Sequence, residues 1–157
     1  MLPDCYRGRR SPGRLGLVTL SRMDNFSGRS VFFVKDAEES MACYTQTLGF
    51  ALDWNHQVEG RAFVFQVSLF GFQLILNQIE DGTKDRAGHG RVFLGIEKDQ
   101  AAALREHVRT RGIAVTRFHW GNPTFVIRDS DGNELFFWLP DDERAEWEAE
   151  LAERGGA

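Results

Sequence analysis

The sequence has few cysteines, no long apolar run and no excess of basic residues. Cys5 and Cys43 are its only cysteines, too few for a disulfide framework or a cysteine-based zinc site. No apolar stretch approaches the ~20 residues that a membrane-spanning helix needs. The net charge of −4 argues against a nucleic-acid partner, because phosphate binding needs a basic surface. These absences predict a cytoplasmic protein with one ordinary hydrophobic core.

The first 22 residues differ in composition from the rest of the chain. They hold five arginines and one aspartate, and glycine and proline interrupt them without apolar periodicity. The rest of the chain therefore carries a net charge of about −8. We expect residues 1–22 to be a disordered or non-native extension and Met23 to be the natural start.

A hairpin near the carboxyl end is the clearest local signal. The tripeptide 131–133 (Asp-Gly-Asn) tolerates positive φ and separates two β-forming runs, 124–127 and 134–138. Side chains alternate along a strand, so the second run has two faces. Leu135 and Phe137 share the face that predicts core. The other face, which is either packed core or the wall of a pocket, holds Glu134, Phe136 and Trp138.

The two halves of the chain repeat one pattern of elements at an offset of about 62 residues. Each half predicts a strand, a helix ended by glycine and three further strands. In the first half we predict strands at 30–34, 51–54, 61–69 and 72–77 and a helix at 36–48. In the second half we predict strands at 91–96, 113–118, 124–128 and 134–139 and a helix at 99–111. The pattern predicts an α+β fold of two βαβββ modules, 29–77 and 91–139, joined by a polar linker over 78–90.

An acidic segment, 141–157, follows the predicted domain of residues 23–140. We predict a helix over 141–154, with Trp147 and Leu151 four residues apart on one face. With few apolar residues, this helix is expected to be solvated and only lightly held by Trp147.

Two sequence motifs in this pattern resemble those of a known superfamily. The first is 36–40 (Asp-Ala-Glu-Glu-Ser), followed by Tyr44 and 48–50 (Leu-Gly-Phe), and the second is 131–135 (Asp-Gly-Asn-Glu-Leu). They resemble the vicinal oxygen chelate superfamily, which includes glyoxalase I, extradiol dioxygenases, fosfomycin-resistance enzymes and bleomycin-binding resistance proteins. The resemblance covers residues 29–139 and implies a cup-shaped mixed sheet built from the two modules. Members with unrelated functions share these structural motifs, so the motifs alone do not identify the function.

The resemblance also identifies the positions at which metal-dependent members carry histidine and glutamate ligands. The matching positions here are Arg29, Ile75, Arg91 and Phe136. None of these side chains binds a divalent ion, which needs carboxylate, imidazole or thiolate donors. We therefore expect no metal and no cofactor. A register shift of two residues would instead bring to the cup His89, Gln73 or Asn77, and Glu134.

The other histidines are not expected to be ligands. We place His56 in a turn, His107 on the exposed side of a helix and His119 in a loop.

Strand parity predicts an aromatic and positively charged inner face for the cup. The candidate ligand-binding residues are Arg29, Phe33, Asn77, Arg91, Phe93, Glu134, Phe136 and Trp138. Flat aromatic surface beside guanidinium groups suits a planar or anionic small molecule. Alternatively, the two arginines extend into solvent or pair with Glu134 or Glu97.

Two functions remain open from the sequence. The first is a metal-free small-molecule binding or sequestering protein of the bleomycin-resistance type. The second is a metal-dependent lyase, transferase or dioxygenase of the same superfamily, with its ligands in another register. The sequence does not decide whether the protein is an enzyme, but the residues at the four matched positions favour a binding protein.

We also expect a homodimer. The predicted outer face of the sheets is more apolar than two small helices can cover. Its residues are Phe32, Leu74, Leu76, Leu135 and Phe137.

Overall fold

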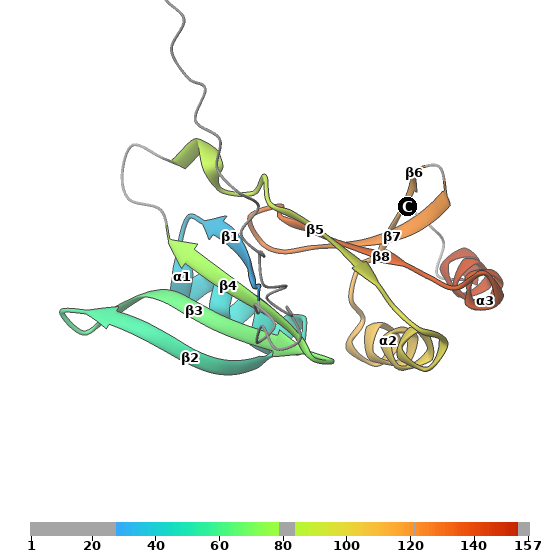
Figure 1. Ribbon diagram of the computed structural model, residues 1–157, viewed down its shortest axis with the longest axis horizontal. Coiled ribbons are helices and arrows are strands. Elements are labelled where there is room, and N and C mark those ends of the chain that lie inside the picture. Colours follow the sequence, from blue (N-terminus) through green and yellow to red (C-terminus); the bar gives the residue numbers. More distant parts are fainter. Residues whose placement is uncertain (1–27, 79–83, 121, 154–157) are drawn as a thin grey trace, which may run out of the picture.

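The computed structural model describes residues 28–78, 84–120 and 122–153, and their elements form two βαβββ modules (Figure 1). The first module contains β1 (Ser30–Val34), α1 (Ala37–Ala42), a π-helical turn (Cys43–Thr47), β2 (Ala51–Val58), β3 (Arg61–Leu69) and β4 (Phe72–Gln78). After a short 3-10 turn, η2 (Lys84–Arg86), the second contains β5 (Arg91–Gly95), α2 (Lys98–Arg111), β6 (Thr116–Trp120), β7 (Asn122–Arg128) and β8 (Glu134–Trp138). Helix α3 (Asp141–Glu153) ends the described chain. The predicted extension, residues 1–22, lies outside the described residues.

Each module forms one four-stranded sheet, and the two sheets have the same topology. Sheet A has the order β1-β4-β3-β2, and sheet B has the order β5-β8-β7-β6. The first strand of each module pairs in parallel with the last, and the remaining neighbours are antiparallel. Parallel neighbours need a crossover, and α1 and α2 belong to these connections. The predicted α+β fold of two repeated modules is confirmed.

The ends of both helices follow local capping chemistry. Asp36 caps α1, since its Oδ1 accepts a hydrogen bond from the Glu39 backbone N–H at 2.9 Å. Helix α2 begins with a reciprocal capping box between Glu97 and Gln100. It ends at Gly112, whose φ of 64° lies in the left-handed region that glycine adopts without strain.

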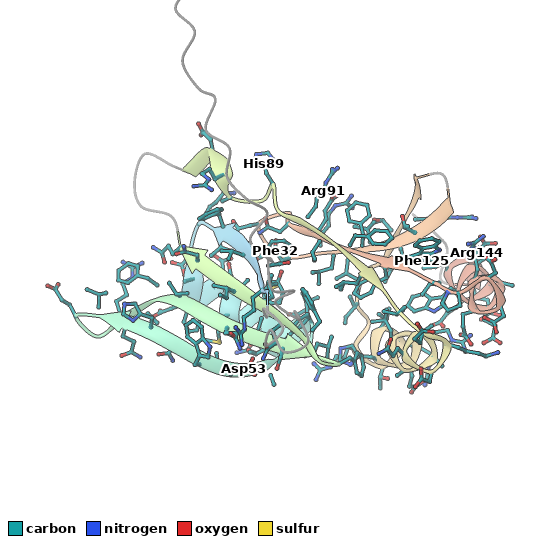
Figure 2. The ribbon with its side chains drawn as sticks, viewed as in Figure 1. Phe32, Asp53, His89, Arg91, Phe125 and Arg144 are labelled. Atoms are coloured by element: carbon teal, nitrogen blue, oxygen red, sulfur yellow. The ribbon has the colours of Figure 1, made fainter. Side chains whose placement is uncertain are left out.

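One hydrophobic core joins the two modules. It contains the inner faces of both sheets together with side chains from all three helices, and Figure 2 labels one core phenylalanine from each sheet, Phe32 and Phe125. Leu135 and Phe137 are 1% and 7% exposed, so their assignment to the core is confirmed.

The physical basis given for a homodimer was wrong. The five apolar residues that were expected to pack against a second copy are buried within this one chain, because the two modules and their helices cover them. These residues are Phe32, Leu74, Leu76, Leu135 and Phe137. The homodimer itself stays a prediction.

Three histidine placements differ from the sequence prediction. Strand β2 continues to Val58, so His56 lies on a strand and not in a turn. His119 belongs to β6. His107 is half-buried, and its Nε2 lies 2.7 Å from the backbone carbonyl oxygen of Leu48 in the other module.

Strand β6 begins only at Thr116 and not at Ile113 as predicted, since Ile113 is buried in the core directly after the end of α2.

Helix α3 packs on the core through Trp147, while about half of its residues are exposed to solvent. Trp147 is 2% exposed, and its ring lies 5.0 Å from that of Phe125 on β7. Ion pairs hold its exposed side, among them Lys98 with Asp142 at 2.6 Å and Arg117 with Glu148 at 2.5 Å. The expectation that Trp147 holds a helix with a largely solvated surface agrees with this arrangement, and the ion pairs to α2 and β6 add contacts that the sequence did not indicate. No helix in the described parts of the chain is long and apolar enough to cross a membrane.

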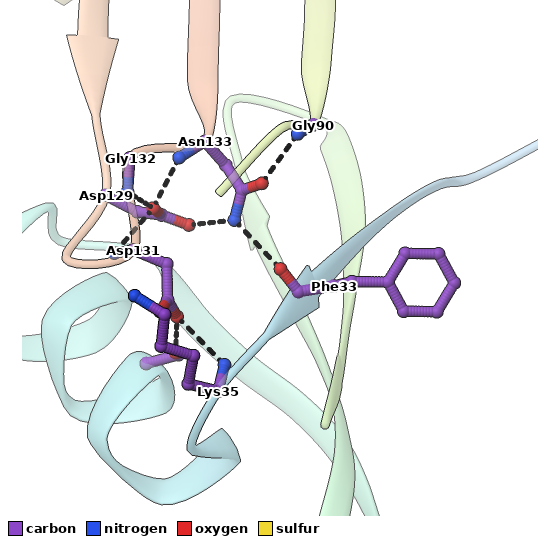
Figure 3. Close-up of polar contacts among 8 residues, drawn as sticks. Phe33, Lys35, Gly90, Asp129, Asp131, Gly132 and Asn133 are labelled. Atoms are coloured by element: carbon purple, nitrogen blue, oxygen red, sulfur yellow. Dashed lines mark hydrogen bonds and ion pairs between the residues drawn. The ribbon is translucent and has the colours of Figure 1, made fainter. Parts of the chain in front are cut away.

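The predicted hairpin turn also fastens the two modules together (Figure 3). Asp129 Oδ1 accepts hydrogen bonds from three successive backbone N–H groups of the turn, at 2.8 to 3.0 Å. The fully buried Asn133 donates to the backbone oxygen of Phe33 on β1 and accepts from the Gly90 N–H before β5. Asp131 accepts hydrogen bonds from the Lys35 N–H and the Ser40 hydroxyl. This buried polar network positions the start of sheet B against the end of β1.

Candidate functional site

Each sheet has one face turned away from the common core, and the predicted site residues divide between these two open faces. The open face of sheet B holds Arg91, Phe93, Glu134, Phe136 and Trp138. The open face of sheet A holds Arg29, Phe33 and Asn77. In Figure 2, Arg91 extends above sheet B, while Asp53, from the open face of sheet A, lies at the lower edge of sheet A. The structure therefore brings five of the eight candidates together and places the other three on the other sheet.

A carboxylate between two guanidinium groups marks one end of the sheet B face. Glu134 Oε1 accepts hydrogen bonds from Arg128 Nε and an Arg128 terminal nitrogen, at 3.0 and 2.8 Å. Its Oε2 lies 2.7 Å from Arg91 Nε, in an ion pair without aligned hydrogen-bond geometry. Glu134 is buried, whereas both arginine side chains are about half exposed or more. The group carries two positive charges and one negative charge, so the positive charge is only partly neutralised.

Aromatic rings continue the same face along β5 and β8. The rings of Phe93 and Trp138 meet edge to face at 5.9 Å, and both residues are nearly half exposed. Phe136 lies between Glu134 and Trp138 on β8 and is paired with Phe93 on β5. It is 5% exposed, and the Arg91 guanidinium lies 5.6 Å from its ring centre. The open face of sheet B therefore has features of both alternatives. One of its rings is buried, as in a packed core, and two are exposed, as in the wall of a pocket.

Arg128 is the functional candidate that the sequence reasoning missed. It lies directly opposite Glu134 in the antiparallel pair of β7 and β8. Its other terminal nitrogen also donates to the Thr116 hydroxyl on β6 at 3.0 Å. Counting outward from the predicted turn would have paired the two residues, because opposite residues of a hairpin share one face.

The open face of sheet A carries a different, more polar set of groups. Asp53 on β2 accepts hydrogen bonds from Gln66 Nε2 at 2.8 Å and from the Ser68 hydroxyl at 2.7 Å. The hydrogen bond from Gln66, followed by that from Ser68, holds the pKa of Asp53 below its ordinary value. The ring of Phe33 lies under the Arg86 guanidinium, 3.8 Å from the ring centre. This face also includes Asn77, which pairs with Phe33 across β1 and β4.

The two faces share one arrangement at the start of each module. Arg29, just before β1, donates from its Nε to Gln73 Oε1 on β4 at 3.0 Å. Arg91, the first residue of β5, contacts Glu134, the first residue of β8, through the same nitrogen. Each module therefore pairs an arginine at its first strand with an oxygen-bearing side chain of its last strand.

The sequence of the whole domain matches one protein family. A sequence model described as "Glyoxalase/Bleomycin resistance protein/Dioxygenase superfamily" matches residues 26–137. The chain belongs to this superfamily. No curated protein sequence matches it significantly.

Solved structures show the same superfamily fold at low sequence identity. The bleomycin-binding protein of Streptomyces verticillus, in complex with copper(II)-bleomycin, is 16% identical, with a TM-score of 0.57 over 76% of this chain and 100% of that one. UcmS2 is 18% identical, with a TM-score of 0.53 over 73% and 98% of the two chains. TnmS3, an antibiotic-binding protein from Streptomyces sp. CB03234, is 22% identical, with a TM-score of 0.50 over 76% and 100%.

The residues at the metal-ligand positions of this superfamily do not fit a divalent ion. The arginines stand where ligands would be needed, and a guanidinium presents only N–H donors and a positive charge. The shifted donors are engaged as well, since Gln73 binds Arg29 and Glu134 binds two arginines. His89 is exposed. In the described parts of the chain, no three His, Cys, Asp or Glu side chains lie close enough to hold a metal.

Proposed function

We propose that this protein binds or sequesters a planar, negatively charged small molecule without a metal, and that the open face of sheet B is its binding surface. The observation that carries the proposal is the pair of guanidinium groups on Glu134 beside the exposed rings of Phe93 and Trp138. The names of two structures with the same fold, a bleomycin-binding and an antibiotic-binding protein, support a binding function.

The spacing of charge and rings defines the kind of ligand. Glu134 and Trp138 are four residues apart on one strand, which corresponds to about 13 Å along the sheet. An acidic group of the ligand would lie against Arg91 and Arg128, where a carboxylate or phosphate can form charge-assisted hydrogen bonds. Its planar part would then lie on Trp138 and Phe93. The ligand would need a flat body and an acidic group at one end.

A ligand titration with matched variants tests this proposal. Trp138→Ala should weaken the binding of planar acids by roughly 2–4 kcal/mol, as loss of a central aromatic anchor does. Val58→Ala removes an equally exposed apolar residue at the far end of β2 and should leave affinity unchanged. A screen in which cationic or aliphatic compounds bind best would contradict the proposal.

We propose in the same way that no resident metal takes part, so the metal-dependent lyase, transferase or dioxygenase is the less favoured function. The support is the donor chemistry, since Arg29 and Arg91 occupy positions where the superfamily's metal-dependent members carry ligands. Elemental analysis of protein purified without chelator should find no stoichiometric divalent ion. About one zinc, nickel, manganese or iron per chain would restore the enzyme hypothesis.

We further propose that the protein is a cytoplasmic homodimer in which sheet A of one copy faces sheet B of the other. Exposed apolar side chains lie on both sheets, including Val31 and Trp54 on sheet A and Phe93 and Trp138 on sheet B. Such a pairing would bring Arg29, Phe33 and Asn77 to the rings of a second copy and complete a cup.

Mixing two defective variants tests the dimer. Arg29→Met damages only sheet A, and Trp138→Ala damages only sheet B. Mixed dimers would contain one intact cup, so an equal mixture should recover about a quarter of the wild-type sites. A monomer by light scattering at micromolar concentration, or no recovery on mixing, would rule out the shared cup.

A further inference from the structure

An apolar cavity lies at the seam between the two modules, away from both open faces. Its volume is about 110 Å³. One wall comes from Phe50, just before β2, and from the β3–β4 hairpin, and the opposite wall comes from β5, α2 and β8. The side chains that form these walls are Phe50, Leu69, Phe72, Leu94, Leu104 and Phe137.

The lining of this cavity excludes charged ligands. Among the described residues that line it, none carries a charge, and apart from Gly95 and Gln100 all of them have phenyl rings or branched alkyl groups. Phe50, Leu104 and Phe137 are each less than 8% exposed, so this part of the lining is buried. A charge placed there would lose its hydration without gaining a partner. Cavities of this chemistry, about 150 Å³ in size, stay dry and bind benzene or xenon.

The cavity is open toward solvent on one side. Phe70 is 54% exposed and Gln100 is exposed, and both residues line it. The Gln100 side chain is already engaged there, because its Oε1 accepts the hydrogen bond from the Glu97 N–H. A small molecule can therefore reach the cavity without separation of the modules.

Phe70 has a backbone conformation that its side chain does not favour. Its φ is +49°, in the two-residue turn between β3 and β4 that it forms with Gly71. Asparagine, aspartate and glycine are the usual residues there, and a bulky residue in the left-handed region is strained. The Phe70 ring meets His107 of α2 edge to face at 5.7 Å. The turn therefore holds Phe70 in a strained backbone conformation. The Phe70 ring lies at the mouth of the cavity and contacts the other module.

We propose that this cavity is a binding site for a neutral, apolar molecule about the size of one aromatic ring. Its volume, its uncharged walls and the ring of Phe70 at its mouth suit such a ligand. It differs in chemistry from the open face of sheet B, which carries arginines. Because both modules form the walls, a bound molecule stabilises their docked arrangement.

Benzene is the probe for the test. Its addition should produce saturable shifts in the methyl resonances of Leu69, Leu94 and Leu104, and it should raise the melting temperature by mass action. Two variants should each weaken this binding by about tenfold, because each removes apolar contact or space. Ile96→Phe fills the cavity from its half-buried rim. Phe70→Asn removes the ring and suits the turn, so the fold should be kept.

Trp138→Ala is the control that separates the two sites, since it alters the open face of sheet B and leaves the cavity intact. It should leave benzene binding unchanged. The proposal is overturned if the shifts fall only around Phe93 and Trp138, if they do not saturate, or if Phe70→Asn folds and binds benzene as tightly as the wild type.

Discussion

Arg91 and Glu134 face each other at the first residues of two parallel neighbouring strands, with 2.7 Å between Arg91 Nε and Glu134 Oε2. In the other module, Arg29 Nε and Gln73 Oε1 lie 3.0 Å apart in the corresponding place. The first pair holds a carboxylate and the second an amide. The two modules thus repeat a geometry while differing in charge, and this difference makes the sheet B pair sensitive to a single substitution.

Replacing Glu134 with glutamine should strengthen anion binding. The carboxylate now neutralises part of the charge of Arg91 and Arg128, and its removal leaves both guanidiniums to the ligand. We expect a gain of roughly 1 kcal/mol for a planar monoanion, the scale of one charge interaction at contact distance in water, and no gain for its neutral analogue. Calorimetric titration measures both. Glu153→Gln on α3 is the control, and a loss of anion affinity in Glu134→Gln would show that the carboxylate organises the site.

Replacing Arg91 with methionine should weaken anionic ligands selectively. The substitution leaves Arg128 and Glu134 as a neutral pair, so the affinity for anions should fall and should depend less on salt, since only the charge interaction is screened. Affinity for a neutral planar ligand should stay near the wild-type value. Arg109→Met on α2 makes the same charge change away from the site. Equal effects of the two variants would mean that net charge, and not the position of Arg91, controls binding.

The carboxyl group of Asp129, in the hairpin turn, should stabilise the folded state more strongly as the pH falls. This change should take place between the pKa of Asp129 in the folded state and its lower pKa in the unfolded state. Burial raises the pKa of Asp129 above its ordinary value of 3.8, and the hydrogen bonds from Asn133 only partly oppose this. The folded state then binds a proton more tightly than the unfolded state. The contribution is fully present below the unfolded pKa and is lost as the pH rises through the folded pKa.

Urea unfolding of the wild type and of Asp129→Asn measures this contribution. The stability of the wild type relative to the variant should decrease from pH 3.8 upward and become constant above the folded pKa. The opposite slope would mean that the turn's N–H groups lower the pKa of Asp129 more than burial raises it.

Truncating Trp147 should destabilise the whole domain. Its indole is buried against Phe125, so Trp147→Ala leaves a cavity beneath α3 and should cost about 3–5 kcal/mol of unfolding free energy. Ala149→Ser, at an exposed position of the same helix, should cost little. Denaturant unfolding monitored by circular dichroism gives both values. An unchanged midpoint for Trp147→Ala would show that α3 does not support the core.

Most of the fold could be predicted from the sequence because its signals are local. Asp36 caps a helix wherever it precedes one, Gly112 ends one, and the Asp-Gly-Asn tripeptide at 131–133 forms a turn within its own few residues. Alternation along β8 separated Leu135 and Phe137 from Glu134 and Trp138 before any partner strand was known. For these reasons the two repeated modules, and most of their elements, were correct.

The sequence by itself determined the elements, their order and the two faces of each strand, whereas the tertiary structure decided which faces meet. The pairing of Glu134 with both Arg91 and Arg128, the packing of Trp147 on Phe125 and the contact of His107 with Leu48 all join residues from different elements. Such contacts depend on how whole surfaces fill space together, and no short stretch of sequence carries that information. The same packing of both modules around one core divided the eight candidate residues between two open faces.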